Sequence, residues 1–222
     1  MHDLTKVKKV HLVGIKGAGM AALTQLLLAD GVSVSGSDVA EYFFTDDTLK
    51  QLGVAPKLFT VDNITDDIDS VIYSAAWEAH AECTAARHAG IPLVSYAQAI
   101  AYYFNNRYGV AVSGTHGKTT TSAMLAYVFS ELGKDPTAVI GSRVIQFGTN
   151  ALVGSSEYFV LEADEYKNKL ALYEPKATII TSIDYDHPDF FKTFDDYKQA
   201  FVDFVNKSEQ EHVIVCSDNE GV

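Results

Sequence analysis

A glycine-rich segment in the middle of the chain carries side chains that suit phosphate binding. It reads Val110-Ala-Val-Ser-Gly-Thr-His-Gly-Lys-Thr-Thr-Thr-Ser122, which predicts a buried strand, a glycine turn and a helix that opens with Lys-Thr. Glycines let the backbone approach an anion closely, and a helix N-terminus directs N–H groups and a positive dipole end toward it. A lysine there can place a charge on the phosphates, and a threonine hydroxyl can ligate Mg²⁺. The predicted nucleotide site consists of Gly114, Thr115, His116, Gly117, Lys118, Thr119 and Thr120.

This segment departs from the general P-loop spacing, in which position 112 would be glycine and is Val112 here. The alternative interpretation is a glycine turn before an ordinary helix. The apolar residues that follow favour an amphipathic helix with its core face formed by Met124, Leu125, Val128, Phe129 and Leu132.

Two later segments place acids directly after predicted strands. The strand that ends at Leu161 runs into Glu162-Ala-Asp164-Glu165, and a second apolar strand leads to Asp184-Tyr-Asp186-His187. Carboxylates at the carboxyl end of a strand form a typical Mg²⁺ site, and a histidine can ligate a metal or donate to an oxyanion. The alternatives are a solvated turn for the acids and a surface histidine for His187.

A second glycine loop lies near the N-terminus, in Val10-His-Leu-Val-Gly14-Ile-Lys-Gly17-Ala-Gly19-Met20. A strand, a glycine loop and a helix in this order are typical of a dinucleotide-binding turn, although Lys16 stands where the middle glycine of that pattern would be. Asp38 follows at a strand end, where a ribose-binding acid sits in such folds. The alternative is a tight turn of any α/β protein. The predicted nucleotide-diphosphate site consists of Gly14, Lys16, Gly17, Ala18, Gly19, Met20, Asp38, Ser74 and Ala75.

The composition is that of a globular protein with an excess of acids. The 222 residues include 29 acids and 17 bases, for a net charge of −12. Nonspecific binding to nucleic acid or to an anionic membrane is therefore not expected. The N-terminus lacks the apolar region of a signal peptide, and no apolar run reaches membrane-spanning length. Two cysteines outside any CxxC pair favour reduced thiols and a cytoplasmic location.

Strands and helices alternate along the chain, which predicts parallel sheets with helices on their faces. Gly90 should end one helix, and the polar stretch 105–108 should separate two domains, 1–107 and 108–222. The strands are expected at Val10–Gly14, Val32–Ser35, Val71–Tyr73, Pro92–Val94, Val110–Ser113, Thr137–Ile140, Tyr158–Leu161, Ala177–Ile180 and His212–Cys216. The other helices are expected at Gly19–Ala29, Ala79–Ala89, Gln98–Phe104 and Asp195–Asn206.

Taken together, these motifs resemble the Mur ligases of peptidoglycan synthesis over residues 9 to about 216. The resemblance rests on Gly114-Thr-His-Gly-Lys-Thr-Thr-Thr121, Glu162-Ala-Asp-Glu165 and Asp184-Tyr-Asp-His187 in this order. Within the family, the branch that adds L-alanine is favoured by Gly14-Ile-Lys-Gly-Ala-Gly-Met20, Gly36-Ser-Asp38, Tyr73-Ser-Ala-Ala76 and Tyr173-Glu-Pro175.

The resemblance implies an N-terminal Rossmann-like domain that holds a UDP-sugar and a P-loop α/β central domain that holds ATP and Mg²⁺. It implies ATP-dependent amide formation between the lactyl carboxylate of UDP-N-acetylmuramate and L-alanine, through an acyl phosphate. Lys118 would hold the phosphates and stabilise the transferring group, while Thr119 and Glu162 would hold the first Mg²⁺. His187 would serve a second Mg²⁺, so Lys118 and His187 are the expected catalytic residues.

Two departures from the family pattern bear on these expectations. Ser182 stands where the family usually has asparagine, and the family's third domain, which brings the amino acid, has no counterpart in these 222 residues. We therefore expect that this chain alone does not ligate, and that its last strand exposes an apolar edge near Val213–Val215 that can pair in a dimer. The alternatives are a ligase that recycles a tripeptide onto UDP-N-acetylmuramate, a noncatalytic UDP-sugar-binding module and, less favoured, a regulatory P-loop NTPase.

Overall fold

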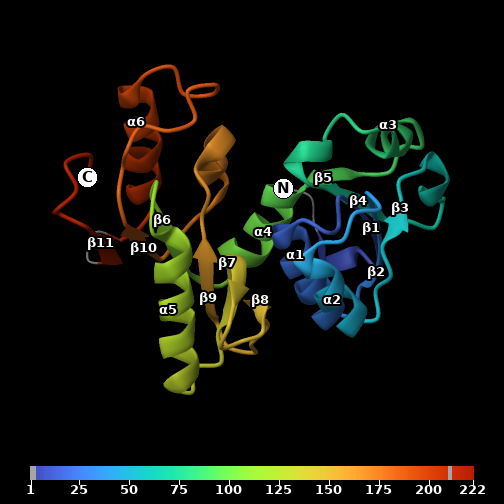
Figure 1. The fold of residues 1–222 in the computed structure, drawn as a ribbon, viewed down its shortest axis with the longest axis horizontal. Helices are drawn as coiled ribbons and strands as arrows, with labels where there is room; N and C mark the ends of the chain where they lie inside the picture. The colour runs from blue at the N-terminus through green and yellow to red at the C-terminus, as the bar shows by residue number, and fades with distance from the viewer. Residues whose placement is uncertain (1–3, 210–211) are drawn as a thin grey trace. The chain divides into compact units, whose positions relative to one another are not determined.

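The computed structural model describes residues 4–209 and 212–222, and they form two compact α/β units (Figure 1). Unit 1 extends to Tyr102 and unit 2 runs from Tyr103 to Val222. The division falls inside helix α4 (Tyr96–Asn105), whereas the polar stretch suggested a boundary at residue 107. The fold class predicted for both halves is confirmed by their sheets.

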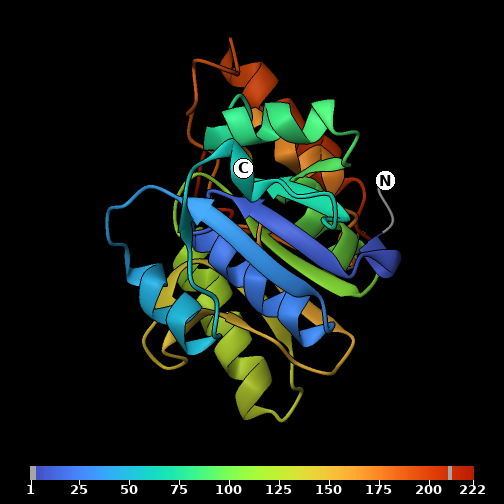
Figure 2. The same ribbon diagram turned by 90° about the vertical axis from the view of Figure 1, so that its right-hand side faces the viewer.

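Unit 1 contains a sheet of five parallel strands in the order β3-β2-β1-β4-β5. Figure 2 shows these strands running side by side. This strand order matches five of the six strands of the dinucleotide-binding fold, 3-2-1-4-5-6, and the carboxyl ends of all its parallel strands meet at one edge. The strands are β1 (Lys9–Val13), β2 (Ser33–Asp38), β3 (Lys57–Leu58), β4 (Ser70–Tyr73) and β5 (Leu93–Ser95).

The helices of unit 1 follow its strands, and the last of them leads from β5 into unit 2. They are α1 (Ala18–Ala29), α2 (Phe44–Gln51), α3 (Ala81–His88) and α4, with short 3₁₀ turns at Leu4–Lys6, Val61–Asn63 and Ala75–Trp77. The pattern analysis did not predict α2, because its sequence, FTDDTLKQ, is mostly polar. Its first turn is capped instead by Asp46, whose carboxylate accepts the Phe43 N–H at 2.7 Å.

Four helices end at a glycine in the left-handed conformation. These glycines follow α1, α2, α3 and α5 (Lys118–Glu131). In each case the N–H of the glycine and that of the next residue bond back to carbonyls of the last turn, which is the Schellman arrangement. The glycines are Gly31, Gly53, Gly90 and Gly133, with φ between 66° and 77°. The helix end predicted at Gly90 is therefore confirmed.

Unit 2 contains a six-stranded sheet in the order β11-β10-β6-β9-β7-β8. Adjacent strands of this sheet run parallel, except that β7 and β8 pair antiparallel. The sequence pattern did not predict this antiparallel pair. The strands are β6 (Tyr108–Ser113), β7 (Thr137–Val144), β8 (Thr149–Leu152), β9 (Tyr158–Glu162), β10 (Ala177–Ile180) and β11 (Val213–Val215).

Helix α5 packs against β6, β7 and β9, but the expected apolar face was partly wrong. Leu125 and Phe129 lie against the core, whereas Met124, Val128 and Leu132 are 64, 48 and 67 % exposed. The small residues Ser122 and Ala126 are the fully buried positions, because the helix lies close to the sheet there. The other helical segments of unit 2 are η4 (Tyr166–Leu172) and α6 (Phe194–Val205). None of the helices in the described part of the chain is both long and apolar enough to cross a membrane.

Strand β11 lies at the edge of its sheet, paired only with β10 among the described strands. Ile214 and Val215 are 62 and 46 % exposed, so the expected exposed apolar edge is present. Pairing of this edge with a second chain stays a prediction.

A buried carboxylate holds the core of unit 1 together. Glu82, on α3, is fully buried and accepts hydrogen bonds from Asn63 Nδ2 at 2.8 Å, from the Thr60 N–H at 3.0 Å and from the Ser37 hydroxyl. The equally buried His11 of β1 places Nε2 3.7 Å from the same carboxylate. Burial alone would raise the pKa of Glu82, but these hydrogen bonds outweigh it and lower the pKa to about 2.

We predict that Glu82→Ala lowers the free energy of unfolding by about 3–5 kcal/mol, because its partners would remain buried without an acceptor. Glu82→Gln should also change the pH dependence. A carboxylate with a lowered folded-state pKa contributes its full stability above its ordinary pKa and loses it as pH falls toward about 2. Urea unfolding between about pH 5 and about pH 2 should therefore be less steeply pH-dependent in Glu82→Gln than in the wild-type chain.

The matched control is Glu41→Gln, which neutralises an exposed glutamate of the same unit. Equal pH profiles for Glu82→Gln and the wild-type chain would show that this carboxylate is not the stabilising group.

Candidate phosphate-binding loops and acid clusters

The first glycine loop leaves β1 at the carboxyl edge of the unit 1 sheet. The N–H groups of Gly14 and Ile15 both donate to the Ser37 carbonyl of β2, at 2.9 and 3.1 Å, and Gly17 N–H donates to Gly14 O. Gly14 has φ = 84°, and a Cβ there would lie 2.3 Å from the Trp77 ring. Ser74 lies on the same side, because its Oγ would be 2.7 Å from that Cβ. The structure thus brings the loop together with Ser74, which caps the Ala75–Trp77 turn.

Asp38 and Lys16, two of the residues expected to bind the nucleotide, are engaged within the protein. One Asp38 oxygen accepts the Lys16 N–H at 2.7 Å and the other accepts the Val39 N–H at 2.8 Å. Lys16 Nζ bonds Glu41 O at 2.8 Å and lies 3.1 Å from the Asp46 carboxylate. Asp38 therefore shapes the loop, and Lys16 ties it to α2.

Apart from Ala75, which lies in the Ala75–Trp77 turn, the remaining residues of this predicted site belong to the first turn of α1. Gly17 is its N-cap, and Gly19 and Met20 come before Ala21, the first residue whose N–H bonds back into the turn, to the Gly17 carbonyl. The Met20 side chain is buried in the core, so its backbone is the part that can face a ligand. Gly19 is fixed by packing, since a Cβ there would lie 2.5 Å from the Tyr96 ring.

A cavity of about 490 Å³ lies beside α2, outside this loop. Its lining includes Asp46, Asp47, Lys50 and the exposed Tyr42. Two acids against one lysine make this cavity less suited to a diphosphate than the loop is.

The second glycine loop joins β6 to α5 and is held by the segment that follows β10. Thr115 N–H donates to Ser182 O at 2.9 Å, and His116 N–H donates to Ser182 Oγ at 3.0 Å. Thr181 Oγ donates to the carbonyls of His116 and Ser113. The serine that replaces the expected asparagine thus supplies both a backbone and a side-chain acceptor to the loop.

The two glycines of this loop, Gly114 and Gly117, differ in how closely neighbouring atoms approach them. Gly114 has φ = 131°, and a Cβ there would lie 2.3 Å from Thr181 Oγ. Gly117, the N-cap of α5, has φ = 80°, with Thr181 as its nearest neighbour at 3.7 Å. The space above Gly117 and the first turn of α5, where Thr120 is exposed, can therefore admit an anion.

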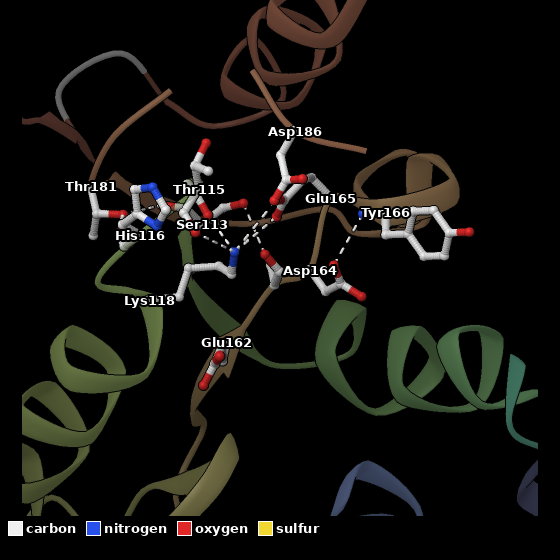
Figure 3. A network of polar contacts seen from close by, with 12 residues as sticks. Ser113, Thr115, His116, Lys118, Glu162, Asp164, Glu165, Tyr166, Thr181 and Asp186 are labelled. Carbon is white, nitrogen blue, oxygen red and sulfur yellow. Dashed lines mark hydrogen bonds and ion pairs between the residues drawn. The ribbon is translucent and has the colours of Figure 1, made fainter. Parts of the chain in front are cut away.

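Lys118 reaches back across the loop to a buried acid. Its Nζ bonds the carbonyls of Gly114 and Thr115 and lies 3.1 Å from Glu165 Oε2 (Figure 3). Glu165 is only 1 % exposed and also accepts the Tyr197 hydroxyl at 3.0 Å. The same hydroxyl lies 2.9 Å from Thr115 Oγ. Burial and the nearby Glu165 charge raise the pKa of Tyr197, so it stays protonated and can donate.

A second acid belongs to a separate pair. Glu162 Oε1 accepts the Thr119 hydroxyl at 2.8 Å, and its Oε2 accepts the Gly141 N–H at 2.6 Å. Figure 3 shows Glu162 apart from the Lys118–Glu165 pair. The two residues expected to share the first Mg²⁺ are thus brought together.

His187 lies with Glu165 and not with Glu162. Its Nε2 is 3.6 Å from Glu165 Oε1 and 3.9 Å from Asp186 Oδ2. Its ring stacks on Tyr166, with centroids 4.6 Å apart. Asp164, Glu165 and His187 offer ligand atoms within 4.8 Å of one another, which is close enough to hold one cation.

Sequence reasoning missed several residues of this network. Glu165 was noted within the acidic cluster but not as the partner of Lys118, and nothing in the local pattern pointed to Tyr197 or Gly141. Tyr197 is a buried residue of α6, and the contacts of its hydroxyl depend on the tertiary fold.

Both halves of the chain match sequence models of one family. Residues 9–108 match the model described as "Mur ligase family, catalytic domain", and residues 112–221 match "Mur ligase middle domain".

Curated relatives agree with these matches. UDP-N-acetylmuramate–L-alanine ligases from Desulfitobacterium hafniense and Solidesulfovibrio magneticus are 42 and 38 % identical over 89 and 98 % of this chain. The Treponema pallidum ligase of the same name is 36 % identical over 96 % of the chain. The chain spans about half the length of these relatives, namely 44, 48 and 46 %.

Solved structures show the same fold. UDP-N-acetylmuramate-alanine ligase from Thermotoga maritima matches 96 % of this chain and 50 % of its own, with 28 % identity and a TM-score of 0.85. The UDP-N-acetylmuramate:L-alanyl-gamma-D-glutamyl-meso-diaminopimelate ligase from Neisseria meningitides matches 97 % of this chain and 73 % of its own, with 26 % identity and a TM-score of 0.87. With family matches in both units and relatives along nearly the whole chain, this protein belongs to the Mur ligase family.

Proposed function

We propose that this chain supplies the UDP-sugar and ATP sites of a ligase that joins L-alanine to the lactyl carboxylate of UDP-N-acetylmuramate. The observation that carries the proposal is the loop between β6 and α5. There, two glycines in the left-handed region, Lys118 and the Thr119–Glu162 pair surround the first turn of one helix. A nucleotide triphosphate is the substrate that uses all of these groups at once.

Lys118 is the residue that would hold the phosphates. In the described structure its ammonium group is paired with Glu165, so it would exchange this carboxylate for phosphate oxygens. Glu165 would keep the Tyr197 hydroxyl as a donor after the exchange. A lysine charge at a transferring phosphoryl group stabilises the charge that develops there.

The residues present also fit a divalent cation. Thr119 and Glu162 offer hard oxygen ligands 2.8 Å apart at the N-terminus of α5, which is the ligand type that Mg²⁺ prefers. Bound Mg²⁺ would neutralise phosphate charge in this position. Asp164, Glu165 and His187 would hold a second cation, with Tyr166 fixing the His187 ring.

Unit 1 would hold the UDP-sugar at the first turn of α1. The loop is preformed by Asp38 and Ser37, and Lys16 contributes through its contact with α2 and not through a free charge. Gly17 supports this assignment, because a Cβ there would meet only Gly14 O at 3.5 Å and Met20 at 3.7–4.0 Å. Its φ of −57° does not require glycine, and as the N-cap of α1 it leaves the helix N-terminus open to an anion.

The names of the curated relatives favour L-alanine over a tripeptide as the amine substrate. The similarity to the Neisseria ligase means that the tripeptide-recycling activity is the alternative to be tested. A cytoplasmic location fits the sugar-nucleotide substrate and is part of the proposal.

The proposal is tested by calorimetry of the 222-residue chain with UDP-N-acetylmuramate and, separately, with Mg-ATP. Binding of both supports it. Binding of the sugar nucleotide without Mg-ATP would favour a noncatalytic UDP-sugar-binding module, and Mg-ATP binding alone would favour a regulatory NTPase. Phosphate release that depends on L-alanine, compared with release that depends on the tripeptide, separates the two ligases.

We predict that Gly17→Val weakens UDP-N-acetylmuramate binding at least about tenfold, with a loss of stability no larger than the roughly 1 kcal/mol expected for a poor N-cap. A Cβ at this position is not crowded, and the added side chain would occupy the path of the diphosphate. Calorimetry and thermal unfolding measure the two effects. Ala29→Val, at the exposed far end of α1, is the control. Unchanged affinity in Gly17→Val would place the sugar nucleotide elsewhere.

We predict that Lys118→Ala abolishes measurable Mg-ATP binding and leaves UDP-N-acetylmuramate affinity unchanged. Loss of this charge removes on the order of several kcal/mol of interaction with the phosphates. Lys192→Ala, which removes an exposed lysine from the same unit, should bind both ligands normally. The role assigned to Lys118 is wrong if its alanine variant binds Mg-ATP like the wild-type chain.

A further inference from the structure

The carboxylate of Glu162 lies at the point where the pairing of strands β7 and β9 ends. Strand β7 pairs with β9 through Thr137–Phe159, Ala138–Val160 and Val139–Leu161, and the pairing stops there. Two residues later, the Gly141 N–H donates to Glu162 Oε2 at 2.6 Å. A side-chain carboxylate thus takes the position of a backbone acceptor at the end of the ladder. The β7–β8 pairing shifts register over the same stretch, between Val139 and Val144.

One contact in the structure explains why position 141 is a glycine. Its φ lies outside the left-handed region, so the backbone does not require glycine there. A Cβ at Gly141 would lie 2.7 Å from Glu162 Oε1 and 3.0 Å from both Cδ and Oε2. All three of its nearest neighbours would be atoms of one carboxylate. Any side chain would force that carboxylate to move, because contacts below 3.0 Å are not tolerated.

Gly141 and Thr119 hold the carboxylate from two directions. The Gly141 N–H donates a hydrogen bond to Oε2, and the Thr119 hydroxyl of α5 donates one to Oε1 at 2.8 Å. With both oxygens held, the carboxylate has one orientation, facing the helix that would carry the phosphates.

We propose that Gly141 is a positioning residue for Glu162, which sets the carboxylate in the geometry that selects Mg²⁺ for the nucleotide. This inference rests on the proposed function, because it takes Glu162 and Thr119 as the cation ligands. Mg²⁺ demands near-ideal octahedral geometry at 2.0–2.1 Å, whereas Ca²⁺ accepts longer and more variable distances. A displaced carboxylate therefore weakens Mg²⁺ binding more than Ca²⁺ binding.

The test is calorimetry of a nonhydrolysable ATP analogue with the 222-residue chain in Mg²⁺, in Ca²⁺ and in EDTA. We expect Gly141→Ala to weaken binding in Mg²⁺ about 10–100-fold, as loss of an outer-shell partner of a metal ligand does. Binding in Ca²⁺ should weaken less, and binding in EDTA should not change. Ser142→Ala, at the next exposed position of β7, should behave like the wild-type chain.

A double-variant cycle tests whether Gly141 acts through Glu162. Gly141→Ala should have no further effect in a Glu162→Gln chain, because the group that it positions is already lost. The inference is overturned if Gly141→Ala lowers nucleotide affinity equally in the wild-type and Glu162→Gln chains. It is also overturned if the loss of affinity is the same in Mg²⁺, Ca²⁺ and EDTA, or if Gly141→Ala binds the nucleotide like the wild-type chain.

A measurement without nucleotide separates this inference from the proposed function. The amide resonance of Gly141 should move in Glu162→Gln and stay in place in Ser142→Ala. If it moves while the wild-type chain shows no Mg²⁺-dependent nucleotide binding, the contact stands and the proposed function fails. If it does not move, the positioning role fails, whatever nucleotide the chain binds.

Discussion

The buried carboxylate of Glu165 is the group on which the arrangement of the phosphate-binding loop depends. A charge with almost no exposure to water must be paired and hydrogen-bonded, or it destabilises the fold. Its partners come from α5 and α6, segments far apart in the sequence, and each of them also contacts Thr115. The need to satisfy one carboxylate therefore fixes the loop, the first turn of α5 and α6 relative to one another.

Unit 1 also has a buried, hydrogen-bonded glutamate behind its glycine loop. Glu82 accepts hydrogen bonds from the end of β2 and from the 3₁₀ turn after β3, and the ring of His11 on β1 lies 3.7 Å away; Ser37, Asn63 and His11 are all buried. Ser37, one of its donors, also offers its carbonyl to the first glycine loop. In both units a buried acid behind the glycine loop sets the loop conformation, so the loop can be rigid before a ligand arrives, which lowers the entropic cost of binding.

Much of this fold could be predicted from the sequence, because parallel strands and glycine turns leave strong local patterns. The strands of both sheets other than β3 and β8, the Gly90 helix end and the two glycine loops were predicted in this way. The polar helix α2 was missed because its cap, and not its apolar spacing, defines it. The apolar residues of α5 were assigned too widely, because spacing alone does not reveal which side of a helix lies close enough to a sheet to require Ser122 and Ala126. Asp38 and Lys16 were expected to face a ligand, yet they bond backbone groups, and Lys16 also the Asp46 carboxylate, that only the folded chain brings near.

The glycines separate what the fold requires from what a ligand requires. Gly31, Gly53, Gly90 and Gly133 end helices, and Gly14 and Gly19 make room for aromatic rings, so the protein alone accounts for them. Gly17 has neither a left-handed backbone nor a crowded Cβ position, and Gly141 is crowded only by the acid that we assign to the cation. Glycine is a common N-cap residue, so Gly17 is compatible with the anion site proposed at α1 but does not by itself require a ligand. Gly141 bears on the proposed cation site only through its contact with Glu162.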